Sequence, residues 1–587
     1  MKTNWRMVYV ALLAVAWMSI GRVTTLAAEP EKDPAILTLE RIFESGEFGG
    51  EGPPALQWSR RRGGYTTWEA SADKVPGRDL VWHDAATDGK EVLVPSHLLI
   101  PPGAESPLSI EGHSFSDDEG KLLIFTNSKR VWRTRSRGDY WVLDIAAGEL
   151  KKLGGDVPPS SLMFATLSPD GSRVAYVYKH NLFSQDLRTR EVTPLTADGS
   201  PQIINGTFDW VYEEELMLQN GFRWSPDSRS IAYWQINTEG VREMLLINNT
   251  DSLYAQVQAI PYPKVGEQNP AARIGVVGAT GGETRWLAVP GDPREHYLSQ
   301  LDWAGDSDEI VLQQFNRLQN TNRLLVAKAE SGEVRTLLTE TDAAWVENSN
   351  THLRWFDDHK KLVWLSERDG WQHAYALTRG DGAVSRITSG NFDAVSVEAI
   401  DERDRWLYYM GSPDNPTQRY LFRARLDGSQ SERLTPADQG GTHHYNISPD
   451  AKVAVHSYST FDTPPVTELI SLPDHKRLRV FSENTKLKET LAKLKRSPTE
   501  FFRVNIGDNV LLDAWCIKPP DFDATKIYPV LFHVYGEPAG CPPCCRNRKR
   551  HPCRETPRDR TSRDAHCRSR TPSRIFRGFG DMLESRP

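Results

Sequence analysis

Short stretches in which apolar and polar residues alternate recur along most of the chain, each after a turn rich in Ser, Pro, Asp or Gly. Examples are LSPDGSRVAYVY from Leu167 and ISPDAKVAVHSY from Ile447. Alternation with a period of two predicts a β-strand with one buried face. Pro presets the preceding turn and Asp caps it with its side chain. The pattern therefore predicts many short strands, each introduced by a tight turn.

Eight copies of this unit are found, mostly separated by about 45 to 60 residues, the spacing expected of four-stranded propeller blades. They begin at Trp58, Phe115, Leu167, Trp224, Trp303, Trp355, Ala399 and Ile447. A single blade cannot bury both of its faces, so a closed ring is the stable arrangement. The pattern predicts a mainly β protein, an eight-bladed propeller. The alternative is a plain β-sandwich with unrelated turns.

Four elements are expected outside the repeats. Residues 37–47 predict a short helix, and residues 483–495 predict a connecting helix with Leu at helical spacing. An alternating hairpin is expected around Gly507. The mostly apolar run from Val530 to Val534 predicts a strand of the kind buried in an α/β sheet.

Composition narrows the class of protein. The chain has 587 residues, of which 39% are hydrophobic and 25% charged, values of an ordinary globular protein with room for more than one domain. Its formal net charge of -7 argues against a general nucleic-acid or anionic-membrane binder. The 18 tryptophans fit many short strands better than a helical bundle.

The amino terminus has the features of a secretory signal over residues 1–28. Lys2 and Arg6 precede an apolar run from Met7 to Ile20, and small residues follow at Ala27 and Ala28. The apolar run is short for a membrane span, so we expect export to the periplasm, the exterior or the cell surface. The competing interpretation is an uncleaved membrane anchor.

The segment FDWVYEEELML, from Phe208 to Leu218, concentrates carboxylates beside aromatic residues. In one interpretation Asp209 caps a helix whose first turns carry the glutamates, where acidic side chains complement the helix dipole. In the other, the carboxylates form an anionic pocket for a cation. Spacing alone leaves both open.

The motif DWVYEEE is similar to the segment by which the dipeptidyl peptidase IV family holds the free amino terminus of a peptide. WLSERDGWQHAY from Trp364, GSPDNPTQRYLFR from Gly411, IPYPKVGEQNP from Ile260 and HYLSQLDW from His296 also resemble segments of that family. The resemblance covers almost everything from Leu37 to Gly540. It implies a propeller followed by an α/β-hydrolase domain, and an exported serine peptidase that removes X-Pro or X-Ala dipeptides from peptides with a free amino terminus.

The resemblance also implies roles for four residues. Glu214 and Glu215 would bind the peptide ammonium, and Arg133 would face a substrate carbonyl, although it is equally well an exposed arginine in a basic cluster. Tyr535, in VYGEP, would help to stabilise the oxyanion. No metal and no cofactor are expected, nucleic acid is not an expected partner, and a homodimer is possible if the hydrolase domain is complete.

The match ends after Gly540. The sequence contains no G-x-S-x-G motif, so the Ser, Asp and His of a serine hydrolase have no candidates, and we expect no peptidase turnover from this sequence. Residues 541–587 are rich in Arg, Pro and Cys, with thirteen Lys or Arg against five acids. We interpret this tail as disordered or translated out of frame. A basic nucleic-acid-binding tail is an alternative, and so is a zinc site formed by Cys541, Cys544, His551 and Cys553.

The expected domains follow. They are a signal peptide (1–28), an N-terminal segment packed near the hydrolase domain (29–50), the propeller (51–482), a connecting helix with the first strands of an incomplete α/β-hydrolase domain (483–540), and the tail (541–587). The alternative function is that of a non-catalytic propeller that binds peptide amino termini or a partner protein through the acidic pocket.

Overall fold

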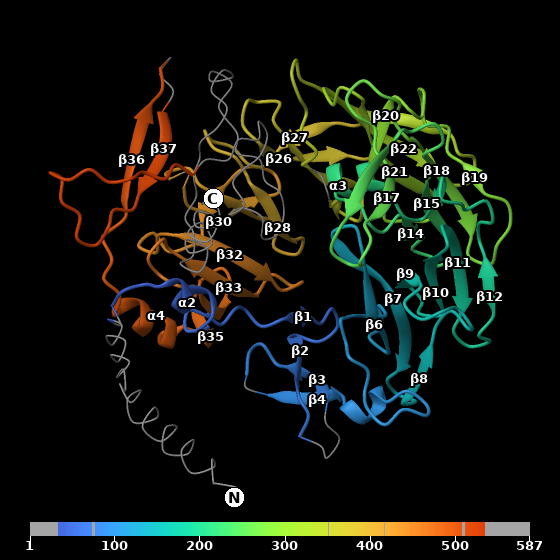
Figure 1. The fold of residues 1–587 in the computed structure, drawn as a ribbon. Helices are drawn as coiled ribbons and strands as arrows, with labels where there is room; N and C mark the ends of the chain where they lie inside the picture. The colour runs from blue at the N-terminus through green and yellow to red at the C-terminus, as the bar shows by residue number, and fades with distance from the viewer. Residues whose placement is uncertain are drawn as a thin grey trace, which may run out of the picture.

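The computed structural model describes residues 33, 35–72, 77–87, 89–349, 352–415, 417–507 and 511–533. The expected signal peptide, Tyr535 and the tail lie outside these residues. Strands dominate, and the few helices are short (Figure 1). Within the described ranges, no helix has the length and apolar character needed to cross a bilayer.

The first four blades consist of antiparallel strands, and the pairing of Arg137 with Met163 and of Gly138 with Leu162 joins blades 2 and 3 into one sheet. Blade 1 has β1 (Leu56–Trp58), β2 (Tyr65–Ala70), β3 (Arg78–His83) and β4 (Lys90–Val94); blade 2 has β5 (Gly112–Phe115), β6 (Lys121–Val131), β7 (Thr134–Asp144) and β8 (Glu149–Lys152); blade 3 has β9 (Leu162–Leu167), β10 (Arg173–Tyr178), β11 (Asn181–Asp186) and β12 (Val192–Pro194); blade 4 has β13 (Ile203–Asn205), β14 (Phe222–Trp224), β15 (Ser230–Asn237), β18 (Ala271–Gly278) and β19 (Arg285–Trp286). An inserted hairpin of β16 (Glu243–Asn248) and β17 (Gln256–Pro261) leaves blade 4 between β15 and β18.

The other four blades each have four strands. Blade 5 has β20 (His296–Trp303), β21 (Glu309–Asn316), β22 (Thr321–Lys328) and β23 (Val334–Thr341); blade 6 has β24 (Arg354–Phe356), β25 (Lys361–Ser366), β26 (His373–Thr378) and β27 (Val384–Arg386); blade 7 has β28 (Ser396–Asp401), β29 (Trp406–Gly411), β30 (Tyr420–Arg425) and β31 (Ser431–Arg433); blade 8 has β32 (Thr442–Ile447), β33 (Val453–Ser459), β34 (Val466–Ser471) and β35 (Arg477–Ser482). The predicted mainly β fold with eight units is confirmed.

In the part of the chain that the structure describes, the remaining elements are four short helices and one hairpin. They are α2 (Leu39–Phe43), the 3-10 helix η1 (Ser96–Leu99), α3 (Trp210–Glu215), α4 (Thr485–Ala492), and the hairpin of β36 (Glu500–Asn505) and β37 (Leu511–Cys516). The helices expected near residues 37–47 and 483–495, and the hairpin expected around Gly507, are therefore present.

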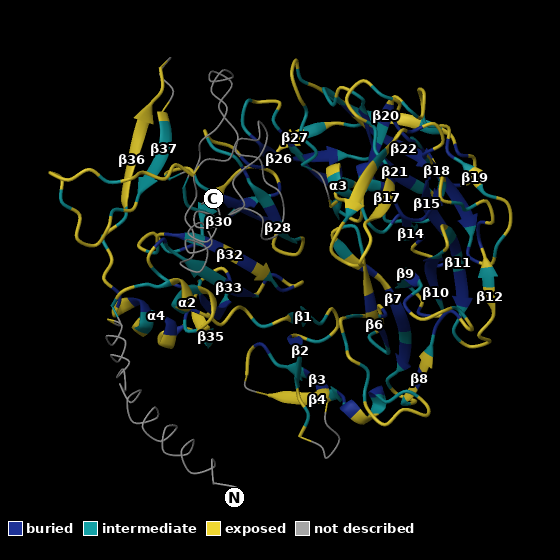
Figure 2. Cartoon of the chain, viewed as in Figure 1, coloured by how far each residue is buried: buried dark blue, intermediate teal, exposed yellow. Residues whose placement is uncertain are grey.

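Apolar clusters between neighbouring blades form the core, and the strands of the blades are largely buried (Figure 2). One cluster joins Leu80 of blade 1 to Leu122 of blade 2, and another joins Trp234 of blade 4 to Leu298 of blade 5. Such a cluster lies between each consecutive pair of blades. Burying one large apolar side chain contributes about 1.5–3 kcal/mol, so these interfaces hold the ring together.

An eighth cluster closes the ring. It brings Tyr65 of blade 1 against Leu469 of blade 8, and the two blades are neighbours in Figure 1. Polar contacts support the closure: the Arg479 guanidinium donates to the Tyr65 hydroxyl at 2.8 Å, and the Trp58 indole donates to Asn446 Oδ1 at 3.1 Å. First and last blades are thus joined by side chains.

Two segments attach to blade 8. Phe48 packs with Leu487 and Leu491 of α4, so the N-terminal segment lies against the helix that follows the propeller. The β36–β37 hairpin projects from the ring (Figure 1) and is anchored by Phe461, whose ring lies 5.5 Å from those of Phe501 and Trp515.

The strand predicted from Val530 to Val534 is wrong over its described residues, 530–533. These residues form no regular secondary structure, and Val530, Leu531 and Phe532 are exposed by 72%, 59% and 84%. A buried strand needs neighbours that bond to its edges and cover its faces. After α4, the described strands are β36 and β37, and they pair with each other, so nothing there buries the apolar run.

Candidate functional site

The acidic helix α3 forms where the sequence indicates. Asp209 caps it: its carboxylate accepts the backbone N–H of Tyr212 at 3.2 Å. Val211 and Tyr212 occupy the buried face, so the glutamates that follow point away from the core. The capping interpretation of Asp209 is therefore confirmed, and it does not exclude the second one, because the same helix orders three carboxylates.

Aromatic contacts fix the orientation of α3. Tyr212 is fully buried, and its hydroxyl accepts the backbone N–H of Leu298 in blade 5 at 3.3 Å. Its ring stacks on Phe208 at 5.7 Å, and Trp210 lies 4.5 Å from the ring of Tyr262. A short helix is marginal alone, so these contacts determine where its carboxylates lie.

The three glutamates have different environments. Glu213 is half-buried, the Glu214 side chain is 16% exposed, and Glu215 is exposed. A partly desolvated carboxylate interacts more strongly with a cation than an exposed one, because less water competes. Glu214 therefore has the environment best suited to bind a cation.

The long β6–β7 hairpin carries Arg133 to this helix. Trp132, at the tip of the hairpin, has φ +51°, a left-handed conformation that allows the tight reversal. Arg133 Nε lies 2.5 Å from Glu214 Oε2, and the Arg133 side chain remains 63% exposed. The structure thus brings together two residues that are distant in the sequence.

A second contact joins the same two elements. Thr134, the next residue of the hairpin, donates to Glu213 Oε1 at 3.5 Å and accepts from Gln219 Nε2 at 3.3 Å. Burial raises the pKa of the Glu213 carboxyl to about 7; the Thr134 hydrogen bond opposes this rise, and the neighbouring charge of Glu214 adds to it. Burial also raises the pKa of Asp209 to about 6, against bonds from backbone N–H groups.

The structure brings together three of the four predicted site residues. Arg133 and Glu214 are in contact, Glu215 lies beside Glu214 on the helix, and Tyr535 is outside the described residues. Sequence reasoning did not assign Thr134 or Gln219, because neither type carries a signal without its partner in space.

Among the described residues, no group of three His, Cys, Asp or Glu has the arrangement of a metal site. The four residues of the zinc hypothesis, Cys541, Cys544, His551 and Cys553, lie outside that part of the chain.

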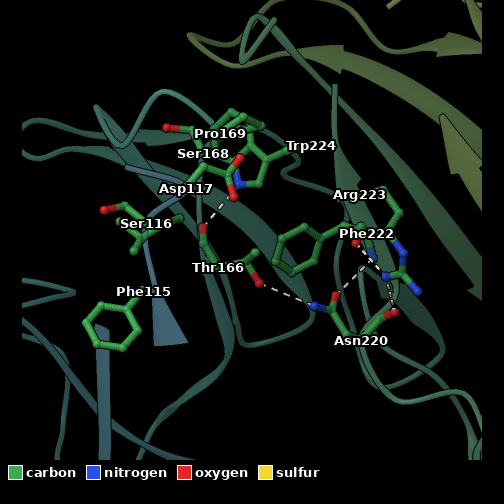
Figure 3. A pocket seen from close by; sticks show the side chains of 11 residues that line it. Phe115, Ser116, Asp117, Thr166, Ser168, Pro169, Asn220, Phe222, Arg223 and Trp224 are labelled. Atoms are coloured by element: carbon green, nitrogen blue, oxygen red, sulfur yellow. Dashed lines mark hydrogen bonds between the residues drawn. The ribbon is translucent and has the colours of Figure 1, made fainter. Parts of the chain in front are cut away.

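A cavity of about 470 Å³ lies beside β5, β9 and β14 of blades 2, 3 and 4 (Figure 3). Its polar walls bond to one another: Asn220 donates to the Thr166 hydroxyl at 3.3 Å, and Arg223 donates to the carbonyls of Asn220 and Phe222. These groups are already satisfied, so the lining serves the packing of three blades.

The ring of blades defines a β-propeller, and Arg133 and Glu214 form an ion pair at its acidic helix. Residues 116–465 match the family model described as "Dipeptidyl peptidase IV (DPP IV) N-terminal region". The chain belongs to this family.

Curated relatives agree with the match. A probable dipeptidyl-aminopeptidase B of Emericella nidulans is 28% identical over 454 residues, which cover 72% of this chain and 49% of the relative. Dipeptidyl peptidase 4 of Trichophyton rubrum is 26% identical over 472 residues, covering 78% of this chain and 59% of the relative. The chain thus spans about half to three fifths of the length of these relatives.

Solved structures give the same fold. The dipeptidyl peptidase 4 of Porphyromonas gingivalis superimposes with a TM-score of 0.76 at 25% identity, over 84% of this chain and 68% of that one. A putative dipeptidyl aminopeptidase IV from Bacteroides ovatus has a TM-score of 0.66 at 18% identity, over 82% and 66%. The second likeness supports the fold alone.

Proposed function

We propose that this chain is the propeller part of an exported dipeptidyl peptidase IV-type serine peptidase. The complete enzyme releases X-Pro or X-Ala dipeptides from free amino termini by acyl-enzyme hydrolysis. In this proposal Glu214 and Glu215 bind the peptide ammonium and Arg133 donates to a peptide carbonyl, whereas Tyr535 would stabilise the oxyanion only in a complete, hydrolysing enzyme.

The contact between Arg133 and Glu214 carries the proposal. It places an anion and a hydrogen-bond donor within 2.5 Å of each other on two separate elements. The amino end of a peptide presents the complementary pair, an ammonium and, within one residue, a carbonyl oxygen. Charge-assisted hydrogen bonds replace the water that the ammonium loses on binding.

Catalysis needs groups that the sequence does not show. A serine nucleophile of this fold sits on a G-x-S-x-G elbow, and the 587 residues contain none. We therefore propose that this chain binds peptides without hydrolysing them. The matching test is incubation with an X-Pro chromogenic substrate: no colour is expected, and robust hydrolysis by the pure protein would contradict the proposal.

The binding test uses calorimetry with a short X-Pro peptide and its N-acetylated copy. The free peptide should bind and the acetylated one should not, because acetylation removes the ammonium. Glu214→Gln should weaken binding about tenfold or more, since a hydrogen bond to a charged group is worth about 1.5–3 kcal/mol. Glu330→Gln, an exposed glutamate of blade 5, is the control. Equal affinity for both peptides would refute the ammonium site.

A second candidate is a non-catalytic propeller that binds a partner protein through the same helix. The exposure of Arg133 and Glu215 favours it, because both are accessible to a large ligand. This function predicts binding that survives acetylation of the partner's amino terminus, so the same pair of ligands distinguishes the two candidates.

A further inference from the structure

The hydroxyl of Thr134 links the hairpin tip to α3 and to the residues that follow it. It accepts from Gln219, which follows α3, and donates to Glu213 within α3. Arg133, one residue earlier, pairs with Glu214. Two consecutive hairpin residues therefore contact two consecutive helix residues, so the position of Arg133 depends on the bond between Thr134 and Glu213.

Among the described residues, Glu214 is the charged group that acts on Glu213, and α3 and the hairpin that packs on it carry further charged groups. Helix α3 contributes Glu214 and Glu215, with Asp209 at the cap, and the hairpin contributes Arg133. Residues 216–221 carry no titratable side chain. Aromatic contacts, Trp210 with Tyr262 and Tyr212 with Tyr297, occupy other sides of α3.

The half-buried Glu213 carboxyl therefore responds to any change of charge at Glu214. Burial, together with the charge of Glu214, keeps the pKa of Glu213 near 7, against the hydrogen bond from Thr134. A cation that settles beside Glu214 offsets the repulsion between the two carboxylates. It thereby favours the ionised form of Glu213.

We propose that Glu213 is a positioning residue of the ammonium site, which holds the Arg133 tip through Thr134 and releases its proton to solvent when a peptide ammonium binds beside Glu214. This inference rests on the proposed function. In this step the O–H bond of the Glu213 carboxyl breaks, the proton passes to water, and the resulting carboxylate faces the peptide ammonium. Glu213 acts through its neighbours and need not touch the peptide.

The test measures the affinity of the free X-Pro peptide between pH 5.5 and pH 7, a range in which its amino group stays largely protonated. A nearby opposite charge lowers a carboxyl pKa by about 1–3 units, so the affinity should rise about tenfold or more across this range. Calorimetry in two buffers of different ionisation enthalpy should show proton release near pH 6.5.

Three variants isolate the role of Glu213. Glu213→Gln should flatten the pH profile and abolish the proton release. Thr134→Val removes the donated hydrogen bond and should move the profile to higher pH, whereas Thr134→Ser keeps the hydroxyl and should leave it in place. A merely structural role would not move a pH profile.

The outcomes separate the two proposals. Binding by the wild type with an unchanged profile in Glu213→Gln and Thr134→Val would overturn this inference and leave the proposed function standing. Absence of binding by the wild type at every pH would overturn the proposed function and the inference with it.

Discussion

The phenol of Tyr212 has a structural role that its sequence neighbours do not reveal. Strand β20 shifts register between Leu298 and Gln300, so a bulge interrupts its pairing with β21. The Tyr212 hydroxyl accepts the N–H of Leu298. One side chain of blade 4 thus completes the hydrogen bonding of blade 5 and fixes the carboxylate helix.

Tyr212→Phe removes this acceptor and leaves a buried N–H without its partner. The expected loss of stability is about 1–3 kcal/mol, seen as a lower urea midpoint by tryptophan fluorescence. Tyr254→Phe is the matched control, because Tyr254 is 81% exposed. Equal midpoints for the two variants would show that the Leu298 contact contributes nothing.

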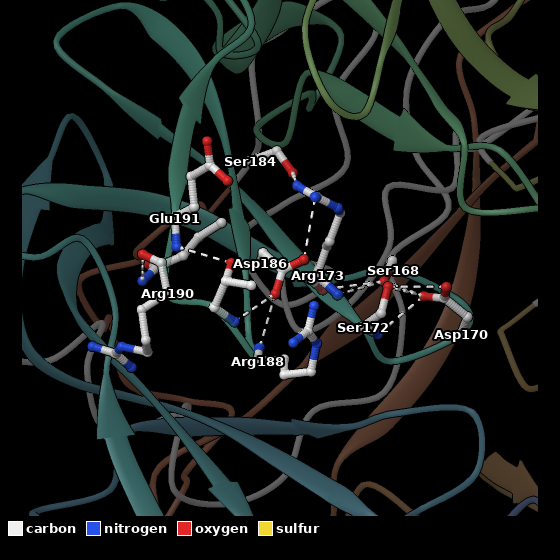
Figure 4. A network of polar contacts seen from close by, with 11 residues as sticks. Ser168, Asp170, Ser172, Arg173, Ser184, Asp186, Arg188, Arg190 and Glu191 are labelled. Atoms are coloured by element: carbon white, nitrogen blue, oxygen red, sulfur yellow. Dashed lines mark hydrogen bonds and ion pairs between the residues drawn. The ribbon is translucent and has the colours of Figure 1, made fainter.

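At the scale of elements, the turns show why the strands were predictable. In blade 3 the Ser168 hydroxyl donates to Asp170 at 2.6 Å, and Arg173 pairs with Asp186 at 3.2 Å (Figure 4). Asp186 also accepts the backbone N–H groups of Arg188 and Thr189. These contacts are local, and the same bond from Ser to the Asp two residues later recurs in blades 2, 4 and 8.

Contacts between distant segments were less predictable. Residues 530–533 have the composition of a buried strand, but burial depends on neighbouring elements and not on the run itself. Likewise Glu213 was visible as a charge, while its link to Thr134 joins two blades. Resemblance to a family assigned Arg133 and Glu214 to one site, but their ion pair was not predicted, since no spacing rule connects a hairpin tip to a helix of another blade.

Blade 8 contains a buried chain of histidines. His443 bonds to His456 at 2.8 Å, and His456 bonds to Glu468 at 3.0 Å. Arg477 from β35 pairs with Glu468, Arg433 from β31 lies near His443, and Tyr445 bonds to His475 at 2.8 Å. These residues come from blades 7 and 8, so the charges of two blades meet in this chain.

We expect acid to destabilise blade 8. Burial and the charge of His456 lower the pKa of His443 to about 3 and that of His475 to about 4. Below the ordinary histidine pKa of about 6.5, these histidines bind protons in the unfolded chain but remain neutral in the folded blade. The contribution of these histidines to the free energy of unfolding should therefore be fully present above about pH 7. It should fall as the pH drops towards 4, by about 1.4 kcal/mol per pH unit for each histidine.

Urea midpoints between pH 7.5 and pH 5 measure this slope. His475→Gln should reduce the slope by the contribution of about one proton, which is about 1.4 kcal/mol per pH unit. His359→Gln, at an exposed turn of blade 6, should not change the slope. A wild-type midpoint that is constant over this range would contradict the assignment.

At the scale of the whole molecule, ring closure depends on the contacts between blades 1 and 8. Arg479→Met removes the guanidinium that reaches Tyr65 and the carbonyl of Thr87. We expect a loss of about 1–3 kcal/mol and faster hydrogen exchange in β1–β4 and β32–β35. Blade 5, farther round the ring, should exchange as before, and Lys328→Met in that blade is the control. Uniformly faster exchange in every blade would argue against a local closure.

Because the closing cluster joins blade 1 to blade 8, it can form only at the end of synthesis. Trp58 and Tyr65 of blade 1 are synthesised early, but the residues they pack against belong to blade 8, which is synthesised last. At about 5–20 residues per second, blade 8 follows about 20 to 80 s later. During this interval that apolar face of blade 1 has no partner, so the yield of folded protein depends on how well the face is shielded until blade 8 has been made.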